Sequence, residues 1–265
     1  MPDLDRMQAL HQQTVARQQK RDAAITKTTE YYESEGVRLG IDIYQPNEAE
    51  FPGIRPGILF FFGGGFMVGC KDAFGPQAEE LAKHGYVAFS ADYRITALHG
   101  TTAPDSMLDG ATAWTYVREN AAKWNLDPER LAAGGGSAGG LIALMTGPLS
   151  GVFPKALVLF NPGVFSTRDQ ENGKRFESWT TRFPIMNTEM LKAGMPPMLI
   201  MHGEDDTTVP YAGVKEFSEK ACSLGIDSRL KTYPGAKHGF FNFNRSRAHY
   251  FLTLGETILF LDEVL

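Results

Sequence analysis

Short, largely apolar segments alternate with amphipathic segments along most of the 265-residue chain. They occupy residues 57–62, 86–91, 156–160 and 198–202, and a fifth precedes Ser137. A strand that is apolar at nearly every position is buried on both faces, as in a parallel sheet covered by helices. Strands that alternate with helices predict βαβ units. We therefore expect a doubly wound α/β fold, in which helices flank a mostly parallel sheet of about eight strands.

An antiparallel hairpin is predicted ahead of these strands, from residues 29–33 and 39–44 on either side of Gly36. Further along, residues 106–123 have the spacing of a helix that packs on the sheet. Its predicted inner face consists of Leu108, Ala111, Trp114 and Thr115.

The periodicity also suggests how the chain is divided. Residues 1–28 are expected to form an N-terminal helical extension, and residues 29–265 one α/β domain. Near residues 161–196 no period is visible, so we expect a small cap inserted over the sheet.

Composition narrows the class of protein. The net charge of −5 and the scattered basic residues argue against a nucleic-acid binder. Cys70 and Cys222 make no disulfide framework, and no residue spacing suggests a metal site. Residues 1–27 lack the apolar core of a signal peptide, and no segment approaches the roughly 20 apolar residues that span a bilayer. We expect a cytoplasmic protein with no membrane span and no cofactor. The sequence leaves open whether the protein forms a homo-oligomer.

A glycine-rich turn follows the apolar segment that ends near residue 136. It contains a G-x-S-x-G motif at Gly135, Ser137 and Gly139, directly before a run of helix-forming residues. In a sharp strand-to-helix turn the serine side chain is exposed, and glycines allow tight packing against the neighbouring elements. Ser137 is therefore a candidate nucleophile if a base and an acid accompany it.

Two later loops supply such partners, one directly after the predicted strand at residues 198–202 and one after a last predicted strand at residues 229–233. Serine needs a base within hydrogen-bonding reach and a carboxylate that orients the base. His238 is the candidate base and Asp206 the candidate acid, with Asp205 as the alternative. Glu204 is interpreted as a solvated charge, and His202 as a support of the acid loop. Ligands of parallel sheets bind at the carboxyl ends of the strands, where all these loops lie.

A third loop, Gly63-Gly64-Gly65, follows the segment 57–62. Its backbone can approach a substrate closely, so the N–H groups of Gly64 and Gly65, with that of Ala138, are candidates for an oxyanion hole. Phe66 is the candidate pocket residue.

In this order the motifs resemble those of α/β-hydrolase carboxylesterases, close to hormone-sensitive-lipase-like and acetyl-xylan-esterase-like enzymes. The resemblance covers about residues 30–265. It rests on four segments, which are Phe62–Phe66, Gly135–Gly140, His202–Pro210 and His238–Phe240.

Two residues depart from the common pattern of these enzymes. Phe62 replaces the usual histidine before the three glycines, so packing is expected to hold the loop in place of a histidine hydrogen bond. Gly136 replaces an acidic residue common in the lipase-like branch, which favours the carbohydrate-esterase-like branch.

The resemblance implies a serine hydrolase that cleaves short-chain carboxylic esters, such as acetyl groups on carbohydrates, through an acyl-enzyme. The expected partner is a small-molecule ester. Two alternatives are kept: a prolyl-oligopeptidase-like peptidase, and a ligand-binding protein that retains the fold without catalysis. Peptidases of this kind usually have an additional large domain and an aromatic residue where Ala138 stands, and only Phe62 favours the non-catalytic alternative.

Overall fold

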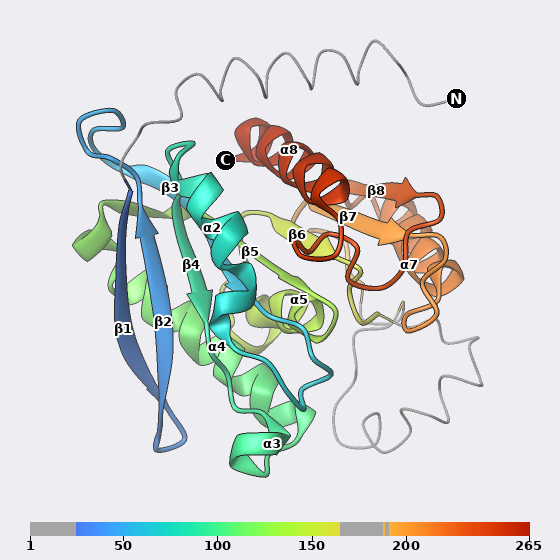
Figure 1. Ribbon diagram of the computed structural model, residues 1–265, viewed down its shortest axis with the longest axis horizontal. Coiled ribbons are helices and arrows are strands. Elements are labelled where there is room, and N and C mark those ends of the chain that lie inside the picture. The colour runs from blue at the N-terminus through green and yellow to red at the C-terminus, as the bar shows by residue number, and fades with distance from the viewer. Residues whose placement is uncertain (1–24, 165–187, 189–190) are drawn as a thin grey trace.

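The computed structural model describes residues 25–164, 188 and 191–265. The strands are β1 (Thr26–Ser34), β2 (Val37–Gln45), β3 (Arg55–Phe61), β4 (Val87–Ala91), β5 (Leu126–Gly136), β6 (Leu157–Phe160), β7 (Met198–Gly203) and β8 (Ser228–Tyr233). They form one eight-stranded sheet in the order β1-β2-β4-β3-β5-β6-β7-β8 (Figure 1). The β1-β2 and β2-β4 pairs are antiparallel, and all other pairs are parallel. The predicted fold class is confirmed.

Helices cover both faces of this sheet. They are α2 (Gly75–Ala82), α3 (Thr96–His99), α4 (Ala103–Glu119), α5 (Ala138–Ser150), α7 (Tyr211–Ser223) and α8 (Arg247–Val264), with 3₁₀ turns η1 (Lys71–Phe74) and η2 (Ala121–Trp124). In Figure 1, α2 and α8 lie in front of the sheet, and α4, α5 and α7 lie behind it. The strands between these two layers are almost fully buried from β3 to β7.

The first strand begins earlier than the sequence pattern indicates. Residues 26–28 belong to β1 and pair with β2, whereas we assigned them to the N-terminal extension. The reason is that β1 is an edge strand with mostly exposed side chains, so it lacks the apolar residues that mark a buried strand. The rest of the predicted extension, and residues 165–187 and 189–190 of the predicted cap, lie outside the described residues.

The inner face of α4 differs from its prediction. Ala111 and Trp114 are buried as expected, but Leu108 is 39% exposed and Thr115 is exposed. The buried stripe instead includes Gly110, where a Cβ would lie 2.1 Å from a methyl carbon of Ile142 on α5. The two helices therefore meet closely at a residue without a side chain, which a search for large apolar residues overlooks.

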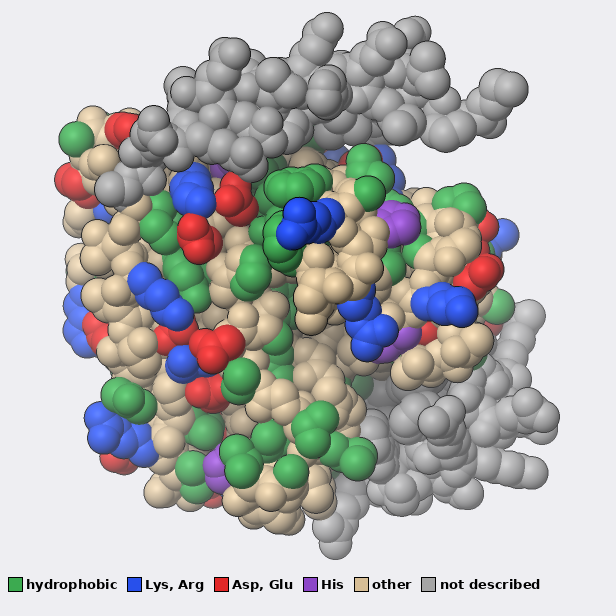
Figure 2. Space-filling view, viewed as in Figure 1, with side chains coloured by type: hydrophobic (Ala, Val, Ile, Leu, Met, Phe, Trp, Pro, Cys, Tyr) green, Lys and Arg blue, Asp and Glu red, His purple; other side chains and the backbone are tan. Residues whose placement is uncertain are grey.

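Hydrophobic side chains gather at the carboxyl ends of the parallel strands. Figure 2 shows them over α3 and its surroundings at the lower edge of the molecule. Met67 and Val68, after β3, are each 56% exposed, and Leu98 on α3 is 76% exposed. This apolar edge borders the loops that carry the candidate site residues.

A buried ion pair ties the segment after β4 to α4. The Asp109 carboxylate, fully buried, accepts hydrogen bonds from the backbone N–H of Arg94 at 2.8 Å and from its Nε at 2.9 Å. The hydroxyl of Ser34, at the end of β1, donates to the same carboxylate. Asp109 therefore joins the end of β1, the segment after β4 and α4.

We predict that Asp109→Ala lowers the free energy of unfolding by about 3–5 kcal/mol, because it leaves the Arg94 guanidinium buried without its counter-charge. Urea denaturation measures this loss. Asp127→Ala, which breaks the partly exposed pair with Arg130, serves as the control and should change stability much less, because water already screens that pair. Equal losses in the two variants would contradict the assignment.

Candidate active site

Ser137 occupies a sharp turn between β5 and α5. Its backbone has φ 54° and ψ −119°, a conformation that is strained for a residue with a side chain. A Cβ on Gly139 would lie 2.1 Å from the carbonyl oxygen of Phe61, and one on Gly135 would lie 2.4 Å from the carbonyl oxygen of Gly139. Both flanking positions therefore require glycine, and the close packing holds the serine at the end of the strand.

The two other candidate side chains converge on this serine. His238, from the loop after β8, has its Nε2 2.9 Å from Ser137 Oγ. Its Nδ1 lies 2.7 Å from Oδ2 of Asp206, from the loop after β7. Residues 101 positions apart in the chain are thus joined in one hydrogen-bonded series. The arrangement can take a proton from the serine and hold the resulting imidazolium.

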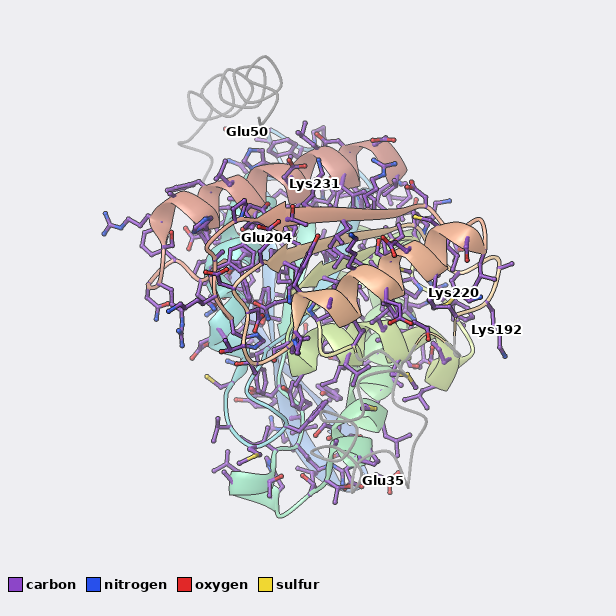
Figure 3. All side chains as sticks on the ribbon, turned by 90° about the vertical axis from the view of Figure 1, so that its right-hand side faces the viewer. Glu35, Glu50, Lys192, Glu204, Lys220 and Lys231 are labelled. Atoms are coloured by element: carbon purple, nitrogen blue, oxygen red, sulfur yellow. The ribbon has the colours of Figure 1, made fainter. Side chains whose placement is uncertain are left out.

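The structure distinguishes Asp206 from its acidic neighbours. Asp206 is only 5% exposed, and its Oδ1 accepts the N–H groups of Thr208 and Val209 at 2.8 and 2.9 Å. Asp205 and Glu204 are exposed, and Figure 3 labels Glu204 near the loop after β7. Burial by itself raises the pKa of Asp206, but the hydrogen bonds from His238 and the two N–H groups outweigh it and hold the pKa below its ordinary value.

His202 lies beside the acid. It is fully buried, and its Nε2 donates to the carbonyl oxygen of Val209 at 2.9 Å and lies 3.4 Å from Oδ2 of Asp206. Burial lowers the pKa of His202, which keeps its imidazole neutral. The side chain bridges the end of β7 and the far end of the acid loop, so it holds the turn that presents Asp206.

The glycine loop after β3 approaches the serine from the other side. A Cβ on Gly63 would lie 3.2 Å from Cβ of Ser137, and one on Gly64 (φ +124°) would lie 1.9 Å from the carbonyl oxygen of Val68. The loop is thus folded tightly on itself next to the turn. Within the described part of the chain, no hydrogen bond uses the backbone N–H of Gly64, Gly65 or Ala138. These three donors remain available to a bound oxygen.

Phe62 is held by packing, as expected from the missing histidine. Its ring is 1% exposed and stacks on Tyr93, with ring centroids 4.0 Å apart and an interplanar angle of 11°. The Tyr93 hydroxyl also donates to the carbonyl oxygen of Phe62 at 2.7 Å. Three and four residues after Tyr93, the N–H groups of Thr96 and Ala97 donate to the carbonyl oxygens of Phe66 and Met67. The segment after β4 therefore clamps the glycine loop.

Gly136, the other departure, accommodates an aromatic ring. A Cβ at this position would lie 2.5 Å from Cζ of Phe241, which follows the His238 loop. That ring packs against Phe160 and Phe74, with centroids 4.7 and 5.7 Å away. The ring of Phe241 therefore fills the space that a side chain at position 136 would need.

A cavity of about 710 Å³ opens over Ser137. The three glycines, Ala138, His238 and the predicted pocket residue Phe66 all line it. Phe66 is 3% exposed, with φ 63°. The cavity has a largely apolar wall and one hydrogen-bonded reactive group, as expected of a site for a small organic molecule.

Asn161 and Tyr93 also contribute to the site, although the sequence analysis gave neither a role. The Asn161 side chain accepts the backbone N–H of Gly239 at 2.9 Å and lies beside His238. Asn161 follows the buried apolar strand β6, just as the loop of Asp206 follows β7, and this placement is the signal that could have found it. No group of metal-binding side chains is present among the described residues.

None of the described helices is long and apolar enough to cross a membrane.

Comparison with known proteins shows which proteins this chain resembles. The BD-FAE family profile matches residues 41–161. The solved structure of esterase 2 from Thermogutta terrifontis with propionate bound is 33% identical, has a TM-score of 0.80, and aligns over 92% of this chain and 95% of that one. Esterase LipC of Mycobacterium tuberculosis is 27% identical over 70% of this chain and 53% of LipC. The methylesterase ICME of Arabidopsis thaliana is 23% identical over 76% of this chain and 54% of ICME.

The fold is therefore that of an α/β-hydrolase. Within that fold, the chain belongs to the carboxylesterases. It spans about half the length of the first curated relatives that it matches.

We predict that Gly136→Ala lowers the free energy of unfolding by about 1–3 kcal/mol, because the added methyl group overlaps the Phe241 ring. Urea denaturation of Gly136→Ala, Phe241→Leu and the double variant measures the coupling. The double variant should lose less than the sum of the single losses. Additive losses would show that the two positions do not share this space.

Proposed function

We propose that the protein hydrolyses carboxylic esters by acyl transfer to Ser137. The observation that carries this proposal is the hydrogen-bonded series from Ser137 Oγ through His238 to Asp206, at 2.9 and 2.7 Å. A serine hydroxyl is a weak nucleophile until a neighbouring base takes its proton. Here the base already lies within hydrogen-bonding distance, and the carboxylate beyond it orients the ring.

In the first step Ser137 Oγ attacks the ester carbonyl while His238 Nε2 takes the hydroxyl proton. Asp206 holds the imidazole through Nδ1 and stabilises its positive charge. The carbonyl oxygen becomes an oxyanion, which binds the free N–H groups of Gly64, Gly65 and Ala138. Each such donor is worth about 2.7–4 kcal/mol of barrier lowering in enzymes where it has been removed.

In the second step the tetrahedral intermediate collapses, and His238 gives its proton to the departing alkoxide. Water then enters, His238 removes one of its protons, and the same three N–H groups bind the second oxyanion. Collapse of this intermediate releases the acid and returns the proton to Ser137. These steps need no metal or organic cofactor.

Two kinds of support favour an esterase over the alternatives. The named relatives are esterases, and Thermogutta terrifontis esterase 2 has structures with propionate and with butyrate bound. Ala138 stands where the peptidases usually have an aromatic residue. A purely ligand-binding role is disfavoured because all three residues of the hydrogen-bonded series, Ser137, His238 and Asp206, are present.

The substrates proposed are esters of short acids, from acetyl to butyryl, with acetylated saccharides as the natural candidates. The ring of Phe241 beside Ser137 and the buried ring of Phe66 narrow the room for an acyl chain near the nucleophile. The apolar wall suits an alkyl group, and the cavity volume leaves room for an alcohol of sugar size.

We predict that Ser137→Ala lowers kcat/KM for p-nitrophenyl acetate by about 10³-fold or more, because the nucleophile is lost. Initial rates with matched protein concentrations measure the loss. Ser150→Ala, at the far end of the same helix, is the control and should retain full activity. Retention of most of the activity in Ser137→Ala would overturn the proposed function.

We also predict that kcat/KM is highest for p-nitrophenyl esters of two to four acyl carbons, since longer chains meet the aromatic residues beside Ser137. A series from acetate to dodecanoate checks this, and acetylated saccharides should be deacetylated by the wild type and not by Ser137→Ala. An optimum at eight or more carbons would contradict the short-acyl assignment.

A further inference from the structure

Asn161 directly follows β6 and lies beside the candidate base. The residue is fully buried, and its backbone has φ 34°, a left-handed conformation that asparagine adopts more readily than most residues. Its backbone N–H binds the carbonyl oxygen of Met201 on β7 at 2.8 Å. Asn161 also lines the cavity. The position is thus rigid, and its side chain meets the substrate space.

The hydrogen bonds determine which way the amide points. Gly239 N–H donates to Oδ1 of Asn161 at 2.9 Å, so the oxygen faces the backbone. The amide nitrogen Nδ2 therefore faces His238, 3.5 Å from Nε2. A backbone N–H can only donate, and this assigns the oxygen and nitrogen of the amide.

Among the described residues, the amide nitrogen of Asn161 has only a long contact, to His238 Nε2, and that acceptor is already in use. The single lone pair of His238 Nε2 accepts the Ser137 hydroxyl at 2.9 Å. Once His238 is protonated, its Nε2–H and the Asn161 Nδ2–H groups are both donors on the same side of the cavity. An oxygen that lies between them, with two lone pairs, satisfies both.

We propose that Asn161 Nδ2 donates a hydrogen bond to the leaving-group oxygen of the substrate, beside His238 Nε2. This inference rests on the proposed function. When the bond between the acyl carbon and that oxygen breaks, the electron pair stays on the oxygen, and the proton comes from His238 Nε2. Asn161 keeps its own protons and stabilises the negative charge that develops on the oxygen before the transfer is complete.

The proposal defines a class of substrate. An ester oxygen has two lone pairs and can accept from both donors at once. The nitrogen of a departing amine has a single lone pair, which must take the proton from His238, so the second donor faces its N–H or alkyl groups. Asn161 therefore favours esters over amides, and it matters most for alcohols that are poor leaving groups.

The test compares ethyl acetate with p-nitrophenyl acetate in Asn161→Asp. Aspartate has the same shape and can still accept the Gly239 N–H, but it replaces the donor with an acceptor. At the pH plateau of each variant, kcat/KM should fall at least tenfold more for ethyl acetate, because p-nitrophenolate leaves without assistance. Asn242→Asp is the matched control. Asn242 lines the same cavity, and its Nδ2 donates to the carbonyl oxygen of Gly239 at 2.9 Å, so the substitution should affect both esters alike.

Equal losses for the two esters in Asn161→Asp would overturn the proposal and reduce Asn161 to a structural support of the His238 loop. If that variant does not fold, Asn161→Ser, which also lacks the amide donor, is compared on the same pair of esters. Activity that survives in Ser137→Ala would instead refute the proposed function. The two failures are therefore distinguishable.

Discussion

The site depends on one steric constraint, the close approach of β3, β5 and α5 around Ser137. The backbone of Phe61 and Phe62 comes so near to α5 that a Cβ on Gly139 would lie 2.1 and 2.3 Å from their carbonyl oxygens. This contact fixes the serine turn and the start of the glycine loop relative to each other. The nucleophile and the expected oxyanion donors are thus set by the packing of the sheet and not by side-chain contacts between them.

The remaining parts are added by loops at the same ends of the strands, and a specific hydrogen bond holds each of these loops. Tyr93 clamps the glycine loop through the carbonyl of Phe62, and His202 spans the loop that carries Asp206. Asn161 joins the end of β6 to the segment after His238 through Gly239. The glycine loop and the His238 loop are therefore anchored from other strand ends, and the Asp206 loop is anchored by His202 on its own strand, which limits the motion needed before reaction.

Much of this could be predicted from the sequence, because most strands of the core are continuously apolar and the candidate acid and base each lie in a loop that follows a predicted strand. The parts that could not be predicted depend on contacts between distant residues. The inner face of α4 is set by Gly110 against Ile142, and Gly136 makes room for Phe241. Asn161 also directly follows a strand, β6, but it lies at the start of the segment that we interpreted as a cap, so we assigned it no role from the sequence.

The central claim is that Ser137 is an activated nucleophile, and covalent labelling tests it most directly. The folded protein is incubated with the organophosphate diethyl p-nitrophenyl phosphate, and the intact mass and the modified peptide are measured. The account predicts one diethylphosphoryl group per chain, located on Ser137, with labelling much slower in His238→Ala. An unlabelled wild-type protein, or a label on another residue, would contradict the account.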